Sequence, residues 1–391
     1  MIQTANSTKL SKYPRDRRYN RFQQPQDATE YNTYTEKDIN FAIDSRYTIT
    51  KILGKGSYGI VCQATDSKPS PFQADPYSVA IKKVANIFDK DVLLKRALRE
   101  LKFMRHFKGH RNIVGLIDID INYVPPYEGL YCFQELLDSD LSRVIYSGVQ
   151  FSDFHVQSFI YQILCGLKYI HSADVIHRDL KPGNILVSTQ GILKICDFGL
   201  ARGVNSKYFR YNATAITNYV ATRWYRAPEL MLSYHNYNKS VDMWAVGCIL
   251  AELFGRRALF PGKNQVDQLH ILIQILGSPT FSVIRKYKWG LSVSARAQYN
   301  KCDWKKLYPF APLSALNLLN NLLDWDPAKR LNVREAIEHP YLDTVRNSDK
   351  EAICKIFDFS FENHFTTLSQ LRNLLEEEIL SFKAEKKLSN H

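Results

Sequence analysis

The chain has 391 residues, of which 45% are hydrophobic and 23% charged, an average globular composition that excludes wholesale disorder, collagen and a disulfide scaffold. At about 150 residues per folding unit, this length predicts two or three units. Lys and Arg outnumber Asp and Glu by 52 to 39, which leaves a net charge of +13. Such a basic chain points to polyanionic partners: nucleic acid, anionic lipid or phosphate-bearing ligands.

The sequence has no apolar run long enough for a signal peptide or a membrane span, so we expect neither secretion nor membrane insertion. Its seven cysteines are scattered, without C-x-x-C spacing. An odd number of scattered cysteines is typical of a reducing compartment. We therefore expect the protein in the cytoplasm, the nucleus or both.

Residues 1–46 are polar and lack sustained periodicity, so we predict a disordered basic extension. The stretch from Tyr13 to Phe22 interleaves Arg with aromatic residues, a pattern that also suits nucleic-acid binding. A solvated basic tail is the favoured interpretation. We therefore expect no nucleic-acid partner.

From Tyr47 to about residue 136 the sequence has short β-like runs separated by glycines, and one amphipathic helical pattern over Val92–His106. Residues 137–342 have longer helical patterns, such as those over Phe154–His171 and Val241–Leu253. A small β-rich unit joined to a larger helical one predicts an α+β fold with a ligand cleft between the two.

The first motif is glycine-rich and consists of Gly54, Lys55, Gly56, Ser57, Tyr58 and Gly59. G-x-G-x-x-G alone also marks dinucleotide-binding folds and occurs by chance, but here it lies between two predicted strands and does not open a helix. This position favours a hairpin folded over phosphates. Lys82 ends a nearby apolar strand and needs an anionic partner. Glu100 of the following helix and nucleotide phosphates are the candidates.

Three further motifs follow in order: His177-Arg178-Asp179-Leu180-Lys181-Pro182-Gly183-Asn184, Asp197-Phe198-Gly199 and Ala227-Pro228-Glu229. With the glycine motif and Lys82, this ordered set resembles the eukaryotic protein kinases. The resemblance implies a bilobal α+β fold, with a β-rich N-lobe at 47–136 and a helical C-lobe at 137–342. It also implies ATP and Mg²⁺ as cofactors and transfer of phosphate to a Ser or Thr. The alternative is a catalytically weak kinase-fold scaffold, although no catalytic position is substituted.

Phosphoryl transfer needs positioning and charge neutralisation, and the motif residues are of the types that supply both. Asp179 is the candidate base for the substrate hydroxyl, and Lys181 is the candidate to neutralise the γ-phosphate. Asn184 and Asp197 supply oxygen ligands for Mg²⁺. The resemblance implies ATP-binding roles for Ile52, Leu53, the glycine motif, Val61, Ala80, Lys82, Glu100, Gln134, Glu135, Leu137 and Asp140. It also implies structural roles for Asp242 and for an Arg330–Glu229 pair.

Thr217-Asn218-Tyr219 runs into Val220-Ala221-Thr222-Arg223-Trp224-Tyr225-Arg226, which resembles the activation lip of the MAP kinases. The resemblance covers about residues 47–382, with an insert after Pro279 and an extension at 343–391 that we expect to pack back on the lobes. It implies phosphorylation of Thr217 and Tyr219. Residues 198–228 include five basic residues and no acidic one. Two phosphates, each of about −1.5 to −2, would nearly balance that charge.

The same resemblance implies how the phosphates are held: Arg99, Arg178 and Arg202 for phosphorylated Thr217, and Arg223 and Arg226 for phosphorylated Tyr219. It implies protein substrates in which Pro follows the Ser or Thr, and an upstream activating kinase or activator protein. More basic residues lie in and after the insert, where we assign no role beyond a surface for an acidic partner: Arg285, Lys286, Lys288, Arg296, Lys301, Lys305 and Lys306.

The sequence departs from the common MAP kinases at Asn218 and Gly183, and in the acidic docking cluster near the C-terminus. There it has Asn347, Asp349, Lys350 and Glu351, so we expect docking peptides rich in Lys and Arg to bind weakly. With these departures and the stretches Arg99–Met104 and Ile176–Asn184, the chain resembles the sporulation branch of the MAP kinases of budding yeasts, which acts in spore-wall formation. Another MAP kinase branch is the alternative.

Overall fold

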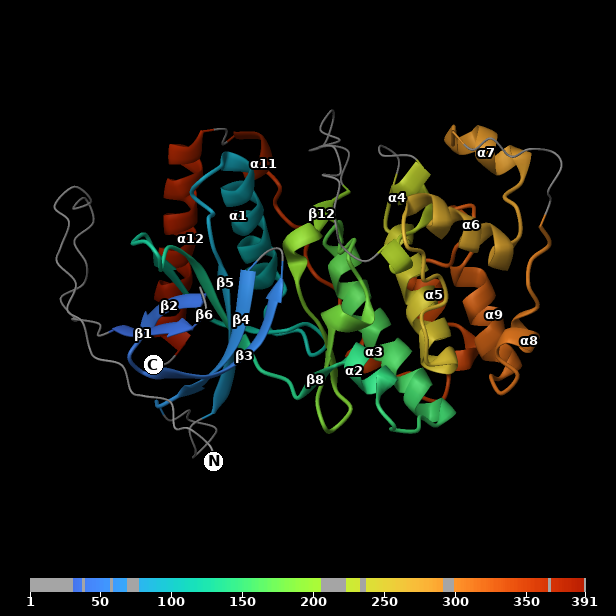
Figure 1. Ribbon diagram of the computed structural model, residues 1–391, viewed down its shortest axis with the longest axis horizontal. Coiled ribbons are helices and arrows are strands. Elements are labelled where there is room, and N and C mark those ends of the chain that lie inside the picture. Colours follow the sequence, from blue (N-terminus) through green and yellow to red (C-terminus); the bar gives the residue numbers. More distant parts are fainter. Residues whose placement is uncertain are drawn as a thin grey trace. The chain divides into compact units, whose positions relative to one another are not determined.

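The computed structural model describes residues 31–36, 39–56, 59–68, 77–204, 223–232, 237–290, 299–364 and 367–389. Thr217, Tyr219, Ser57 and Tyr58 lie outside these ranges. The chain forms two compact units, one from residues 1–102, 115–136 and 365–391 and the other from 103–114 and 137–364 (Figure 1). The first is β-rich and the second mainly helical, which confirms the predicted α+β fold. No helix within the described ranges is long and apolar enough to cross a membrane.

A five-stranded antiparallel sheet, in the order β3-β4-β5-β7-β6, is the centre of the β-rich unit. Its strands are β3 (Tyr47–Gly56), β4 (Gly59–Asp66), β5 (Ser78–Val84), β6 (Leu116–Asn122) and β7 (Gly129–Glu135). Successive side chains of a strand point to opposite faces. Because Val61 pairs with Lys82 and Ala80 with Gln134, these four residues share one face of the sheet.

The opposite face of the sheet is covered by a hairpin of β1 (Tyr31–Glu36) and β2 (Ile39–Asp44). Phe41 and Ile43 are buried in a cluster with core residues of the sheet: Tyr47, Cys62, Ala64, Val79, Ile81, Tyr131 and Phe133. The predicted disorder of residues 1–46 is therefore wrong for these two strands, because their apolar side chains two residues apart bury on the sheet. Residues 1–30 lie outside the described residues.

Two helices complete the β-rich unit, and they run beside each other in Figure 1: α1 (Asp91–His106), whose last turn belongs to the helical unit, and α12 (Leu368–Ser389). One stripe of α12 is buried and consists of Leu371, Leu375, Ile379 and Phe382. Ion pairs flank this stripe, from Lys102 to Glu378, Lys383 to Asp120 and Lys386 to Asp118. The last part of the predicted C-terminal extension is thus bound to the β-rich unit.

The helical unit is built around α5 (Ser240–Gly255), in which every residue from Val241 to Leu253 is buried. The other longer helices are α3 (Asp153–Ser172), α6 (Gln265–Leu276), α7 (Phe281–Tyr287) and α9 (Leu313–Leu322). Shorter helices are α2 (Leu141–Tyr146), α4 (Pro228–Leu232), α8 (Trp304–Leu307), α10 (Val333–Ile337) and α11 (Phe361–His364). The predicted helices over residues 92–106, 154–171 and 241–253 correspond to α1, α3 and α5.

Short strands and 3₁₀ turns hold the motif residues of the helical unit. The strands are β8 (Ser139–Asp140), β9 (Val175–Ile176), β10 (Ile185–Val187), β11 (Leu193–Ile195) and β12 (Arg202–Gly203). The turns are η2 (Pro182–Asn184), η3 (Phe198–Leu200), η4 (Arg223–Tyr225), η5 (Pro340–Leu342) and η6 (Ser348–Lys350). Strands β11, β10 and β8 form one small sheet, and β12 pairs with β9.

Candidate active site

Lys82 of β5 forms the ion pair with Glu100 of α1 that the sequence suggested. The Nζ–Oε1 distance is 2.5 Å, and the two side chains are 11% and 5% exposed. A charge so far out of water needs a partner, and Glu100 fixes the position of the ammonium group. The face that carries Lys82 also carries Val61, Ala80 and Gln134, four of the residues implied to bind ATP.

Ile52 does not join this group. The register of β3 and β4 shifts between Ile52 and Gly54, and the Ile52 side chain packs against the cluster under the β1–β2 hairpin. The Ile52 side chain therefore lies on the face of the sheet opposite Lys82.

The glycines of the first motif serve different purposes. Gly59 has φ +144°, and a Cβ there would lie 2.2 Å from the backbone oxygen of Lys83, so only glycine fits. A Cβ on Gly54 would meet no described atom within 4 Å, and on Gly56 only the oxygen of Gly59 at 4.0 Å. Gly59 is thus required by the sheet, while the other two leave open space beside the backbone.

In the helical unit, one buried carboxylate holds the loop that begins at His177. Asp242 of α5 accepts hydrogen bonds from the backbone N–H groups of His177 and Arg178, both at 2.8 Å, and from Nε2 of His171 at 2.9 Å. Burial acts to raise the pKa of Asp242, but the bonds and charges from His171 and His177 outweigh it and lower that pKa. Arg178 takes the left-handed conformation, with φ 66°, that the loop needs to turn there.

The candidate base Asp179 lies in this loop and is oriented by its two predicted neighbours. Its Oδ2 accepts from Nζ of Lys181 at 2.8 Å and from Nδ2 of Asn184 at 3.0 Å, and its backbone oxygen accepts from Nδ2 of Asn184 at 2.8 Å. The amide nitrogen of Asn184 is thereby used for orientation. Its Oδ1 is the atom left to ligate a cation.

His177 connects the loop to the second predicted metal ligand. Its Nδ1 accepts from the N–H of Asp179 at 3.3 Å, so Nε2 carries the proton and donates to the backbone oxygen of Cys196 at 3.0 Å. Asp197, the next residue, has φ 66° and accepts from the N–H of Gly199. Phe198 is buried against the rings of His177, Phe107 and Phe103, so Asp197 is held from both sides.

The arginines implied to hold phosphates lie in three places: near the catalytic loop, at the turn η4 and in the β-rich unit. Arg202 pairs with Ile176 through β12 and β9, which brings it to the start of the loop that contains Arg178. Arg223 and Arg226 flank the turn η4, where the N–H of Arg226 donates to the oxygen of Arg223. Arg99 belongs to the β-rich unit, where it is 8% exposed.

The segment after the lip is anchored by two aromatic side chains. Nε1 of Trp224 donates to the backbone oxygen of Gly262 at 3.1 Å, and the hydroxyl of Tyr225 donates to Glu252 at 2.6 Å. Tyr146 donates to the other oxygen of Glu252 at 2.8 Å. Burial raises the pKa of Glu252, while the two tyrosine bonds act to lower it.

Four other residues predicted from the sequence make structural contacts. Arg330 and Glu229 form the expected buried bidentate pair, at 2.6 and 2.8 Å, which confirms their structural role. Asp140 caps α2 by accepting from the N–H of Arg143, so its carboxylate already has a structural task. The N–H of Glu135 donates to the backbone oxygen of Gly115.

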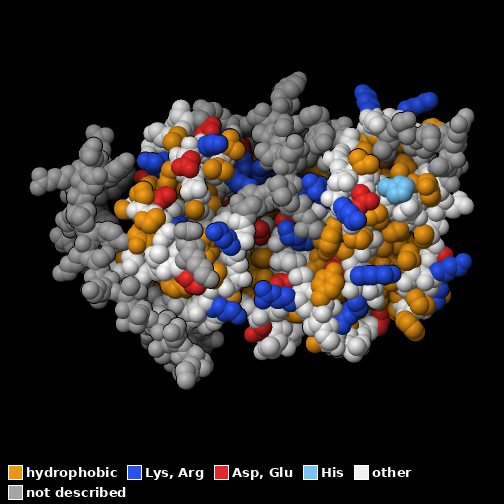
Figure 2. Space-filling model, in the orientation of Figure 1, with side chains coloured by type: hydrophobic (Ala, Val, Ile, Leu, Met, Phe, Trp, Pro, Cys, Tyr) orange, Lys and Arg blue, Asp and Glu red, His pale blue; other side chains and the backbone are white. Residues whose placement is uncertain are grey.

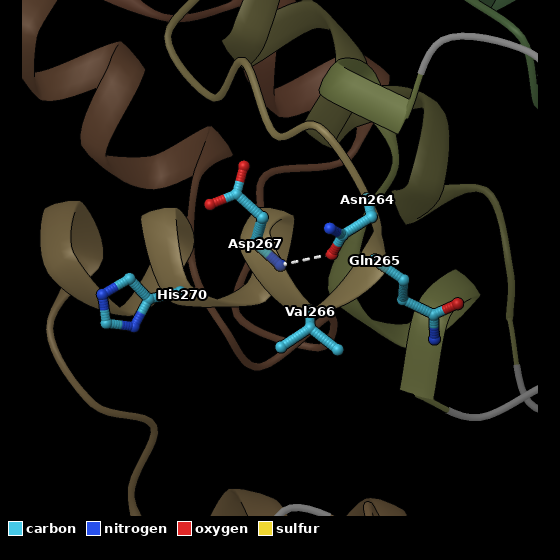
Figure 3. A pocket seen from close by; sticks show the side chains of 5 residues that line it. All are labelled: Asn264, Gln265, Val266, Asp267 and His270. Carbon is cyan, nitrogen blue, oxygen red and sulfur yellow. Dashed lines mark hydrogen bonds between the residues drawn. The ribbon is translucent and has the colours of Figure 1, made fainter.

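A hollow of about 640 Å³ lies at the start of α6 (Figure 3). It is lined by Asn264, Gln265, Val266, Asp267 and His270. The side chain of Asn264 accepts from the N–H of Asp267 at 2.9 Å and so caps the helix. None of the predicted catalytic residues borders this hollow, and we assign it no step of phosphoryl transfer.

Comparison with known proteins decides the family. Residues 47–342 match the protein kinase domain. The chain is 52% identical over 354 residues to the sporulation-specific mitogen-activated protein kinase SMK1 of Saccharomyces cerevisiae, which covers 88% of this chain and 90% of that protein. It is 48% identical to the mitogen-activated protein kinase mpkA of Aspergillus fumigatus, over 88% of this chain and 80% of that protein. It is 46% identical to SLT2/MPK1 of S. cerevisiae, over 91% and 74%.

This chain is a mitogen-activated protein kinase. The resemblance drawn from its motifs is confirmed, and the kinase is a serine/threonine protein kinase.

Sequence reasoning missed two parts of this site in the kinase. It treated Asp242 as a fold residue only, although this carboxylate holds the catalytic loop, and it gave His177 no role beyond its motif. The signal for Asp242 was a lone acidic residue at the start of an apolar helical run. Such a residue must find donors when it is buried.

We expect Asp242→Asn to lower the free energy of unfolding by about 3 kcal/mol, because an amide offers one acceptor atom where the three N–H donors now meet a carboxylate. Because Asp179 is displaced with the loop, kcat should fall more than KM rises. Urea unfolding and steady-state kinetics measure the two effects.

Asp326→Asn is the matched control. Asp326 is also a buried carboxylate of the helical unit with several hydrogen bonds, but it lies outside the catalytic loop. It should lose stability and keep kcat. Equal loss of kcat in both variants would show that Asp242 acts only on stability.

Proposed function

We propose that this kinase transfers the γ-phosphate of ATP to Ser or Thr followed by Pro, that phosphorylation of Thr217 and Tyr219 activates it, and that it acts in sporulation and spore-wall formation. The observation that carries the catalytic part is the set of bonds from Lys181 and Asn184 to Asp179, in a loop held by Asp242. The biological part is supported by the 52% identity to the sporulation-specific kinase of S. cerevisiae.

Each catalytic residue has a task that its surroundings support. Asp179 orients the substrate hydroxyl and takes its proton, a contribution of about 10²–10⁴-fold in rate. Lys181, already 2.8 Å from Asp179, neutralises charge on the transferred phosphate. Lys82, held by Glu100, binds the phosphates of ATP from the β-rich unit.

Asn184 and Asp197 are the residues to hold Mg²⁺. The donor set fits this ion, because Mg²⁺ prefers oxygen ligands and needs few of them from the protein when phosphates supply others. In the described ranges no cluster of three or more His, Cys, Asp or Glu side chains suits a metal ion. A site with one Asp and one Asn does not require such a cluster. Bound Mg²⁺ would neutralise charge on the phosphates of ATP.

The switch rests on the arrangement of arginines. The β9–β12 pairing brings Arg202 toward Arg178, and Arg226 directly follows η4, which begins at Arg223. Phosphates on Thr217 and Tyr219 would add negative charge that these cations can bind. Each charge-assisted bond contributes about 1.5–3 kcal/mol, enough to offset the ordering of one or two backbone residues at about 1–2 kcal/mol each.

Docking is expected to differ from that of the common MAP kinases. Glu351, the one Glu in the eroded acidic cluster, is only 6% exposed and is bound by Lys168 at 2.9 Å and Arg346 at 3.0 Å. Burial acts to raise its pKa, but these bonds and charges lower it. A carboxylate already paired with two cations attracts a basic peptide weakly, which supports an activator that does not depend on this cluster.

The double variant Thr217→Ala with Tyr219→Phe should fold normally and lose about a hundredfold or more of its activity, because two or more phosphate contacts are lost.

The variant Asp179→Asn should lose about 10²–10⁴-fold in kinase activity even when Thr217 and Tyr219 are phosphorylated. Peptide kinetics on protein isolated from active cells, with mass spectrometry of the lip, measure both. Thr50→Ala with Tyr299→Phe, a Thr and Tyr exposed elsewhere, is the control and should keep full activity. Full activity in the lip variant would refute the switch.

In a peptide library that places each amino acid in turn directly after the acceptor Ser or Thr, peptides with Pro at that position should be phosphorylated about tenfold or more faster. This is the size of discrimination that a shaped pocket provides. Tyr225→Phe removes the bond to Glu252 and should weaken this preference, while Tyr299→Phe should not. A library without a preference for Pro would end this part of the proposal.

Expression of this kinase in S. cerevisiae cells that lack SMK1 should restore spore formation, and the Asp179→Asn variant should not. Parallel expression in cells that lack SLT2/MPK1 tests the alternative branch. Restored function in the second strain alone, with active kinase present in both, would contradict the sporulation assignment while leaving the catalytic proposal intact.

A further inference from the structure

The loop between α8 and α9 presents apolar side chains to solvent. Phe310 is 99% exposed, a greater exposed fraction than that of any other large hydrophobic residue in the described ranges, and Leu313 is 73% exposed. A ring exposed to this degree lies in no groove of its own unit. Neighbouring exposed apolar residues with a polar rim often mark an interaction site, whereas a single exposed apolar residue needs no such explanation.

This loop is firmly held at its base. Trp304 and Tyr308 are 7% and 8% exposed, and their rings stack with centroids 6.4 Å apart. The N–H of Tyr308 donates to the oxygen of Trp304, and that of Ala311 to the oxygen of Tyr308. Nζ of Lys305 donates to the oxygen of Ala311 at 3.1 Å. Phe310 is thus presented outward by a fixed turn.

Basic residues outnumber acidic ones around the loop, where Asp303 caps α8 just before the two lysines. From Trp304 to Leu323 the sequence has no acidic residue, and Lys305 and Lys306 are both exposed. Arg257, exposed at the end of α5, lies close enough to Tyr308 to oppose the rise that burial causes in the pKa of its hydroxyl. Figure 2 shows basic and hydrophobic side chains in the region of α8, with acidic ones among them.

We propose that this surface, the α8–α9 tip, binds the face of a bilayer that contains anionic phospholipid. We define the tip as Arg257, Lys305, Lys306, Phe310 and Leu313. Phe310 and Leu313 would enter the boundary between head groups and acyl chains, and the three cations would meet the head groups. Contact of this kind differs from spanning a membrane and leaves the active-site residues untouched.

Two observations favour a lipid surface over a protein partner. The occupant must supply an apolar environment around a protruding ring and negative charge around it, and a bilayer interface supplies both along a plane without a matching pocket. Two of the three cations are lysines, which are depleted at protein interfaces, whereas a lipid surface attracts any Lys or Arg near it. The proposal does not depend on the sporulation assignment.

Sedimentation of the full-length kinase with vesicles tests the proposal. Binding to vesicles of phosphatidylcholine and phosphatidylserine should exceed binding to phosphatidylcholine alone, and added salt should weaken it. Phe310→Asn with Leu313→Asn should lower binding by about tenfold or more through lost apolar burial. Arg257→Glu with Lys306→Glu, which leaves the Lys305 bond to Ala311 in place, should lower it by at least about fivefold for each charge. Peptide phosphorylation without vesicles should be unchanged in both variants.

Matched controls lie on α7 of the same unit. Phe281→Asn removes another exposed ring, and Arg285→Glu with Lys288→Glu makes the same charge change away from the tip. Both should bind vesicles as the unaltered kinase does. Equal binding by the tip variants, or loss in the α7 variants instead, would overturn the proposal.

Light scattering without vesicles tests the other occupants. Oligomers that the Phe310→Asn and Leu313→Asn double variant disrupts would show that the tip binds a second copy of the chain. Vesicle binding that requires an added acidic protein would show that the tip binds that protein. Either result would overturn a direct contact with lipid.

Discussion

The catalytic half of the helical unit depends on one buried negative charge. Asp242 stands at the start of a helix whose next residues are buried on all sides, where a carboxylate without donors would be very costly. Three N–H groups meet it, two from the backbone of the catalytic loop and one from His171. In such surroundings each bond is stronger than in water, so the helix dictates where His177 and Arg178 lie. Asp179 follows them directly.

Hydrogen bonds connect the loop that Asp242 holds to both the candidate base and the segment of Asp197. His177 bonds to the N–H of Asp179 with one ring nitrogen and to the oxygen of Cys196 with the other, so the candidate base and the segment of Asp197 share one support. Phe198 then buries against Phe103 and Phe107. A displacement of the loop must therefore move the predicted metal ligand as well, which couples the positions of base and cation.

The sequence predicted a feature best when residues close together in the chain determine that feature. Contiguous motifs carry their chemistry in residue type, so Asp179, Lys181 and Asn184 were predicted together and lie together. Long-range pairs were predicted where a charge in an apolar strand demanded a partner, as for Lys82 with Glu100, or where the family resemblance implied one, as for Arg330 with Glu229. The irregular register of β3 beside Ile52 was not predicted, because a strand bulge cannot be seen from alternation alone. The β1–β2 hairpin was missed because Phe41 and Ile43 gain their burial from a sheet formed much later in the chain.

The basic residues behind the net charge of +13 do more than bind phosphate. Lys102, Lys383 and Lys386 form the ion pairs that bind α12 to the β-rich unit, and Lys168 and Arg346 occupy Glu351. Cations committed to ion pairs cannot serve a mobile ligand without a loss elsewhere. Residues 198–228 differ in their own charge, because their sequence has basic residues and no acidic one. If the proposed phosphorylation of Thr217 and Tyr219 activates the kinase, no carboxylate within residues 198–228 can take the place of the phosphates, since this segment has no Asp or Glu.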